Sequence, residues 1–237
     1  GSRLESGEPM GECEGLQMLN DLGGPSVTSR VCCHREDAVE LAEKIGYPVV
    51  VKTAAGSIIH KSDIAGVALG LSTADEVRAA YDRLSELGPE VCVAQTAPAG
   101  VEVAFGMVND PQFGPIVMVG AGGTRVEVAD DKTFALPPFG NTTAKDLLQG
   151  LSMAPLFSGA RGADPVDIDQ LAETLALFSV ICHALGGLVA EMDLNPVIVS
   201  HVVNSPGRKS VDTFGACRYS VRLVYHSNYP LDNIIDV

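Results

Sequence analysis

The spacing of hydrophobic and polar residues predicts a chain that mixes helices and strands. Apolar positions recur with the period of a helix in five segments, at residues 15–22, 35–45, 73–87, 143–150 and 168–185. Alternating or short apolar runs predict strands at residues 26–32, 48–52, 67–71, 92–95, 101–108, 115–119, 125–128, 188–192 and 196–200. The first half of the chain therefore predicts a small lobe made of strand, loop, strand, helix and strand.

A short flexible segment divides the predicted elements into two groups. Residues 97–100 have the sequence Ala-Pro-Ala-Gly, which supports neither a helix nor a strand, and we place a hinge there. The division gives an N-terminal lobe over residues 14–96 and a C-terminal lobe over residues 97–214. Residues 201–237 differ in composition from the rest of the chain, and residues 215–237 form an atypical tail to which the sequence assigns no role.

The charge of the chain limits the partners it can have. Asp and Glu number 30 against 16 Lys and Arg, which gives a formal net charge of −14. A general nucleic-acid binder neutralises many phosphates with basic side chains, so this composition argues against that class. Small anionic ligands remain compatible with it, because a few well-placed cations can form a local positive pocket.

No segment of the sequence predicts insertion into a membrane or secretion. The most apolar stretch, residues 175–190, is too short to span a bilayer, and we interpret it as a buried helix. The amino terminus carries no secretory signal, and the six cysteines show neither a C-x-x-C pair nor the spacing of a zinc site. We therefore expect a cytoplasmic protein with reduced cysteines.

Two segments of the first lobe carry candidate chemistry. Lys52 ends a run of valines, where a strand can open on a ligand cleft and an ammonium can meet a phosphate. Taken alone, it is better explained as an ordinary lysine at the end of an edge strand. The loop that follows brings together His60, Lys61, Ser62 and Asp63. His60 can accept a phosphoryl group, Asp63 can orient its ring and Lys61 can neutralise the transferred charge, but a solvated loop explains these residues equally well.

The strongest local pattern lies near the end of the second lobe. Alternation places Glu191, Asp193 and Asn195 on one side of a predicted strand. Three oxygen donors within an apolar stretch are costly to bury unless they meet a cation or a hydrogen-bond network. Oxygen ligands suit Mg²⁺ that is shared with phosphates. The glycine-rich loop at residues 120–124 is a weaker signal, because such a loop forms a tight hairpin more often than it binds phosphate.

The order of the motifs resembles a known family. The segments PVVVK, IIHKSDIAGV, NDPQFGPIVMVGAGG with VEVADD, ARGADPVD and EMDLNPVIV follow one another as in the ATP-grasp domain of ADP-forming acyl-CoA (acetyl-CoA) synthetases. The sequence is more distantly similar to the β subunit of succinyl-CoA synthetase. The resemblance covers residues 14–214 and implies an α+β fold of the ATP-grasp type, in which two α+β lobes hold a nucleotide between them.

The resemblance implies which residues bind ATP or ADP. Lys52 matches the lysine that contacts the nucleotide phosphates, and Arg161 falls within a matching segment that we assign to the same task. Gln95 lies at the hinge position that contacts adenine, where relatives often have Glu. Glu102 matches a carboxylate near the ribose or the adenine.

The resemblance also implies a phosphorylated residue and a metal ion. His60 matches a histidine that is transiently phosphorylated in this branch of the family, with Lys61 and Asp63 beside it. Asn195 matches an asparagine that helps to hold Mg²⁺, and Asp212 lies where the second Mg²⁺ ligand, a carboxylate, is expected.

The implied reaction converts acyl-CoA, ADP and phosphate into a carboxylic acid, CoA and ATP. This chain would supply only the nucleotide half of it, with the loop of residues 54–65 carrying the phosphoryl group to a second site. A CoA-binding subunit, or the rest of a longer chain, would supply the other half. The alternative is a non-catalytic, nucleotide-sensing module of the kind fused to protein acetyltransferases. A ligase that joins a carboxylate to an amine shares the fold, but the loop around His60 makes it less attractive.

Overall fold

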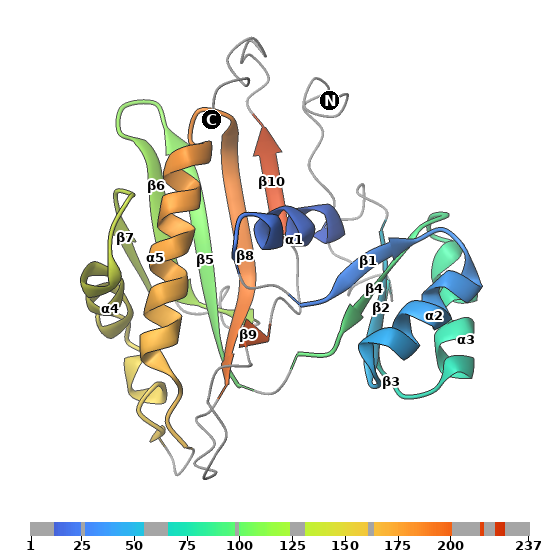
Figure 1. Ribbon diagram of the computed structural model, residues 1–237. Helices are drawn as coiled ribbons and strands as arrows, with labels where there is room; N and C mark the ends of the chain where they lie inside the picture. The colour runs from blue at the N-terminus through green and yellow to red at the C-terminus, as the bar shows by residue number, and fades with distance from the viewer. Residues whose placement is uncertain are drawn as a thin grey trace.

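The computed structural model contains two β-sheets that lie side by side, each with its own pair of helices (Figure 1). The first sheet has four strands and the second has six. Every strand pair within the described residues is antiparallel. The structure describes residues 12–24, 27–54, 66–97, 100–123, 131–160, 164–200, 214–215 and 221–225.

The first sheet follows the predicted pattern. Its elements are the strands β1 (Ser29–Cys32), β2 (Val49–Thr53), β3 (Val67–Leu71) and β4 (Val91–Gln95) and the helices α2 (Arg35–Ile45) and α3 (Ala74–Ser85). The strand order is β1-β4-β2-β3. Thr73 and Glu76 form a capping box at the start of α3, and Gly46 ends α2 with a φ of 89°. These signals are local in the sequence, which is why the ends of the two helices are predictable.

Alternation along the central strands gives the first sheet two different faces. Val49 and Val51 of β2 and Val93 of β4 are buried in the core beneath α2 and α3. Lys52 follows Val51 in the strand, so its side chain lies on the opposite face. Ala94 of β4 also lies on that opposite face, where it joins the larger core of the molecule.

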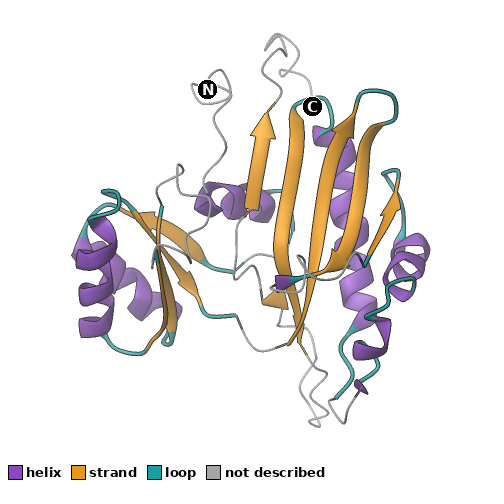
Figure 2. Ribbon diagram, turned by 180° about the vertical axis from the view of Figure 1, so that it is seen from behind, coloured by secondary structure: helices purple, strands orange, loops and turns teal. Residues whose placement is uncertain are grey.

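The second sheet is larger and carries most of the core. Its elements are the strands β5 (Gly100–Asp110), β6 (Gly114–Ala121), β7 (Lys132–Ala135), β8 (Val189–Ser200), β9 (Phe214–Gly215) and β10 (Val221–Tyr225) and the helices α4 (Asn141–Gln149) and α5 (Ile168–Leu185). The strand order is β10-β8-β5-β6-β7, and β9 pairs with β8. Both helices lie on the same side of this sheet, as the view from behind shows (Figure 2).

The helix α5 explains the apolar stretch that the sequence interprets as a buried helix. It is the one helix of the described residues that is long and apolar enough to cross a membrane. Leu171 and Leu175 are fully buried on the second sheet, and the ring of Phe178 lies 5.6 Å from that of Phe105 of β5. Packing against the sheet therefore accounts for its composition.

The prediction of two separate strands near the end of the second lobe is wrong, because β8 is continuous. On β5 one residue lies between Val103 and Phe105. On β8 two residues lie between their partners Val197 and Leu194. The extra residue forms a bulge around Asn195 and Pro196. Proline has no N–H to donate, so a bulge is one of the places where a strand tolerates it. The strand β7 is not predicted by the pattern, and the strand predicted at residues 125–128 lies outside the described residues.

Two segments near the ends of the chain, one helix and one strand, contact the second sheet. The helix α1 (Glu12–Asp21) packs on β1 and β10, and its Leu16 and Leu19 belong to the larger core. The strand β10 pairs with β8 as an edge strand (Figure 1). Part of the tail, to which the sequence assigns no role, is therefore a structural element of the second sheet.

The expectation that every cysteine is reduced is wrong. Cys13 of α1 and Cys92 of β4 form a disulfide, with 6.4 Å between their Cα atoms and 79 residues between them in the sequence. Only the packing of α1 against the first sheet brings this pair together. Cys32, Cys33 and Cys182 are free, and burial raises the pKa of the Cys182 thiol, so that side chain stays protonated.

Candidate functional site

Lys52 is a buried cation at the centre of the first sheet. Only 3% of its surface is exposed, and it pairs with Cys92 of β4 and with Val67 of β3. An ammonium group is costly to bury unless polar or anionic groups accompany it. Its position therefore brings a positive charge to the face of the first sheet that is opposite α2 and α3.

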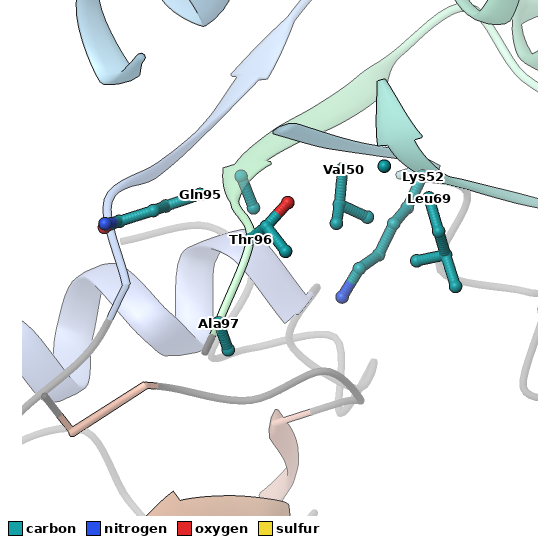
Figure 3. Close-up of a pocket in the computed structure, with 8 residues that line it drawn as sticks. Val50, Lys52, Leu69, Gln95, Thr96 and Ala97 are labelled. Carbon is teal, nitrogen blue, oxygen red and sulfur yellow. The ribbon is translucent and has the colours of Figure 1, made fainter. Parts of the chain in front are cut away.

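A cavity of about 200 Å³ adjoins Lys52 (Figure 3). It is lined by Val50, Lys52, Leu69, Gly70, Ala94, Gln95, Thr96 and Ala97. These residues come from β2, β3, β4 and the segment that follows β4. A mainly apolar wall with a few polar groups is typical of a small-molecule site. The cavity also borders the predicted hinge.

Gln95 and Thr96 are neighbours on the wall of this cavity, but their side chains point in different directions. Figure 3 shows the Gln95 side chain directed away from Lys52, whereas Thr96 and Lys52 extend into the same space. The backbone N–H of Gln95 donates to the carbonyl oxygen of Thr28 at 3.0 Å, which ties the end of β4 to the segment before β1. Gln95 thus borders the cavity, and Thr96 is a polar neighbour that the sequence analysis missed. Its position directly after Gln95 is the signal that would have identified it.

A second group of residues meets where β5, β6 and β8 run side by side. The N–H of Gly123 donates to Oδ1 of Asn195 at 2.8 Å, and the N–H of Gly122 donates to the carbonyl oxygen of Glu102 at 3.0 Å. Gly123 has a φ of 66°, and a Cβ added to it would overlap Oε2 of Glu102. Only glycine fits this backbone and this close approach. The glycine-rich loop, a weak signal in the sequence, is therefore where Glu102 and Asn195 meet.

Several side chains of β8 carry oxygen atoms, which are the ligands that Mg²⁺ prefers. Glu191 is exposed and Asp193 and Asn195 are half-buried, whereas the residues between them are buried, which confirms the predicted alternation. The amide oxygen of Asn195 has two lone pairs, so it can accept from Gly123 and still bind a cation. Within the described ranges, no three His, Cys, Asp or Glu side chains gather into a metal site.

The structure describes four of the predicted site residues and brings them together in two pairs. Lys52 and Gln95 line the cavity of the first sheet, and Glu102 and Asn195 meet at the glycine-rich loop. The other predicted site residues lie outside the described residues: His60, Lys61, Asp63, Arg161 and Asp212. Their roles remain predictions.

Comparison with known proteins identifies the family. A family profile described as an ATP-grasp domain matches residues 4–204. The β subunit of acetate–CoA ligase (ADP-forming) I of Pyrococcus furiosus is 34% identical over 198 residues, which span 80% of this chain and 85% of that subunit. The 4-hydroxybutyrate–CoA ligase (ADP-forming) of Nitrosopumilus maritimus is 36% identical over 198 residues, which span 79% of this chain and 28% of that protein. The chain thus corresponds to nearly a whole subunit in one relative and to one segment of a longer chain in another.

Comparison with solved structures supports the same family. The dinucleotide-forming acetyl-coenzyme A synthetase 1 of Candidatus Korarchaeum cryptofilum, in complex with coenzyme A and Mg-AMPPCP, is 32% identical and superposes with a TM-score of 0.78. The match covers 92% of this chain and 93% of that chain. The α+β fold expected from the motifs is thereby confirmed. The chain belongs to the ATP-grasp domain family and has the β subunits of ADP-forming acetate–CoA ligases among its relatives.

Proposed function

We propose that this chain performs the nucleotide-binding, phosphoryl-transfer half of an ADP-forming acyl-CoA synthetase. The complete reaction would be acyl-CoA + ADP + phosphate ⇌ carboxylic acid + CoA + ATP. The observation that carries the proposal is a buried lysine at the wall of an apolar cavity, in a chain that is related along most of its length to such a β subunit. A nucleotide offers an apolar base and charged phosphates, which match these two features.

The nucleotide would lie between an N-terminal lobe over residues 14–96 and a C-terminal lobe over residues 97–214. Lys52 and Gln95 would contact it from the first lobe, and Glu102 and Arg161 from the second. Lys52 and Arg161 would neutralise the phosphates, because phosphoryl transfer depends mainly on alignment and on screening of charge.

Asn195 and Asp212 would hold Mg²⁺. The ion would supply positive charge to the phosphate oxygens during transfer. Asn195 fits this role because its side-chain oxygen is held in place by the N–H of Gly123, while its second lone pair remains available. The bulge in β8 places Asn195 at an irregular point of the strand, and bulges commonly direct side chains next to active sites.

His60 would accept the phosphoryl group. A ring nitrogen forms a bond to the terminal phosphorus of ATP, the bond from that phosphorus to the bridging oxygen breaks, and ADP leaves. Asp63 would orient the imidazole, and Lys61 would neutralise the transferred charge. The Korarchaeum relative is described with a phosphohistidine segment that points towards its nucleotide-binding site, which supports this role for the loop.

The second half of the reaction would need a CoA-binding partner, either a separate subunit or another part of a longer chain. One relative is named as a β subunit, and in another the matching segment makes up 28% of a single chain, so both arrangements occur in the family. We propose a cytoplasmic location, in line with the acyl-CoA chemistry. A purely nucleotide-sensing module is less well supported, because the relatives reported above are named as ligases or synthetases.

Labelled ATP tests the proposal. We expect the isolated chain, incubated with Mg²⁺ and ATP labelled in the γ-phosphate, to bind the nucleotide and to take up an acid-labile label. Acyl-CoA should form only when a CoA-binding partner is added. Failure to bind any nucleotide would contradict the proposal, and acyl-CoA synthesis by the chain alone would contradict the assignment of half a reaction.

Gly123→Ala tests the contact of the glycine-rich loop with the side chains of Glu102 and Asn195. The added Cβ would overlap the Glu102 carboxylate and would move the N–H that holds Asn195. We expect the free energy of unfolding to fall by about 1–3 kcal/mol and the affinity for MgATP to fall as well. Denaturation with urea and calorimetric titration measure the two effects.

Gly46→Ala is the matched control for this variant. Gly46 also has a positive φ, 89°, but a Cβ added there meets no atom within 4 Å. It carries backbone strain of its own without the overlap, so it should leave MgATP affinity unchanged. Equal effects of the two variants on affinity would show that the loop contact has no part in binding.

A further inference from the structure

A disulfide ties the first sheet to a helix that also packs on the second sheet. Cys13 lies in α1 and Cys92 in β4, and 6% of Cys13 and 2% of Cys92 are exposed. The helix α1 packs on β1 of the first sheet and on β10 of the second. Its Leu16 and Leu19 belong to the larger core, which lies mainly on the second sheet. The disulfide therefore restrains how the two sheets can move relative to each other.

The strand that carries Cys92 also forms part of the cavity wall. Cys92 is paired with Lys52 across β4 and β2. Side chains directly opposite each other in such a pair share one face of the sheet, with Cβ atoms about 4.5–5.5 Å apart. Ala94 lies two residues further along β4, on the same face, and both it and Gln95 line the cavity. A change in the bond to Cys92 therefore acts on one wall of the candidate nucleotide site.

The proposed location and reaction of the chain bear on what this disulfide does. Glutathione and thioredoxin keep most cytoplasmic thiols reduced, and the disulfides found there are usually transient and either catalytic or redox-sensing. The proposed synthesis of acyl-CoA transfers no electrons, so its chemistry has no use for a disulfide. These two points favour a regulatory pair. The alternative is a structural disulfide, which stabilises the fold and is not exchanged while the chain is folded.

We propose that Cys13 and Cys92 form a reversible redox pair that regulates nucleotide binding, and that the disulfide form binds MgATP more tightly than the dithiol form. The inference rests on the proposed nucleotide binding and cytoplasmic location and deepens the first of them. The proposed nucleotide contacts come from both sheets, Lys52 from the first and Asn195 from the second. The disulfide fixes α1 to β4, so these two sheets are held in one arrangement before the nucleotide arrives. A site that is ordered in advance binds its ligand more tightly.

A dithiol reduces the pair by thiol–disulfide exchange. Its thiolate forms a bond to Sγ of Cys13, which is the more exposed of the two residues, and the bond between the two Sγ atoms breaks. The electron pair passes to Sγ of Cys92, which takes up a proton. The second thiol of the reductant then displaces Sγ of Cys13, and the reductant leaves as a disulfide. The chain gains two electrons and two protons, and oxidised glutathione reverses these steps.

Titration calorimetry with MgATP compares the two redox states of the same chain. We expect the Kd of the dithiol form, kept in excess dithiothreitol, to be about 3- to 10-fold higher than that of the disulfide form. Reoxidation with oxidised glutathione should restore the lower value. Alkylation followed by mass spectrometry should label Cys13 and Cys92 in the dithiol form and neither in the disulfide form. A folded chain that resists dithiothreitol, or a dithiol form that circular dichroism shows to be unfolded, would identify a structural disulfide and overturn the proposal.

Cys13→Ala removes the disulfide without a reductant. This variant should bind MgATP with the Kd of the dithiol form, and dithiothreitol should not change that value. Cys33→Ala is the matched control, because Cys33 is exposed and free. It should retain both redox states and the difference in Kd between them. A response to dithiothreitol that persists in Cys13→Ala would place the redox-sensitive group elsewhere and would overturn the proposal.

The same titrations distinguish failure of this inference from failure of the proposed function. If the disulfide form binds MgATP and the dithiol form binds it equally tightly, or more tightly, the inference about the cysteine pair is wrong and the proposed function stands. If neither form binds a nucleotide, the proposed function itself has failed.

Discussion

His60→Ala should abolish uptake of the γ-phosphate label from ATP. The imidazole nitrogen is the proposed acceptor of the phosphoryl group, and alanine offers no nucleophile in its place. With the CoA-binding partner present, the rate of acyl-CoA formation should fall by more than about 1,000-fold. Acid-labile incorporation of labelled phosphate and a coupled assay of acyl-CoA measure the two effects. The variant should still bind MgATP, because the nucleotide contacts are assigned to other residues.

His34→Ala is the matched control for this experiment. His34 is exposed, and it precedes α2 at a position where its side chain makes no capping hydrogen bond. Its removal should leave labelling and turnover as they are in the unaltered chain. Acid-labile label that persists in His60→Ala would place the phosphoryl acceptor elsewhere and would contradict the proposed role of His60.

Lys52→Met should weaken the binding of MgATP by about 10- to 100-fold. A hydrogen bond to a charged group contributes about 1.5–3 kcal/mol, and methionine keeps the length of the side chain without its charge. The effect should be specific to the phosphates, so the affinity for adenosine should change little. Titration calorimetry with the two ligands separates the contact with the phosphates from contacts with the nucleoside.

Lys44→Met provides the comparison for a lysine outside the site. Lys44 lies on the exposed side of α2, where its ammonium is 2.8 Å from the Glu40 carboxylate. Such an exposed pair contributes little to stability, and it is not part of the cavity. This variant should bind MgATP as the unaltered chain does. A loss of adenosine affinity as large as the loss of MgATP affinity in Lys52→Met would contradict a phosphate contact.

The elements of the first sheet were largely predictable from the sequence because their signals are local. The bounds of α2 and β3 coincide with the segments 35–45 and 67–71 that the pattern predicts. A helix that ends at a glycine and a strand that alternates both depend on residues only a few positions apart. The same reasoning fails at β8, where Pro196 suggests a break and the strand instead continues through a bulge.

The candidate site was predictable only in part. Alternation alone places Asp193 and Asn195 on one face of a strand, and the structure confirms it. Lys52 is not distinctive in the sequence by itself. Its burial at the wall of a cavity depends on β3 and β4, which pair with its strand on either side. Its role was inferred from the resemblance of the whole set of motifs.

The helices, most of the strands and the types of residue available for chemistry follow from the amino-acid sequence, because hydrophobic period and turn residues depend on near neighbours in the chain. Which distant residues meet depends on the three-dimensional packing. It joins Cys13 to Cys92, holds Asn195 against Gly123 and buries the Thr96 hydroxyl without a partner among the described residues. Each of these depends on how strands and helices pack, and packing brings together residues whose separation in sequence carries no local signal.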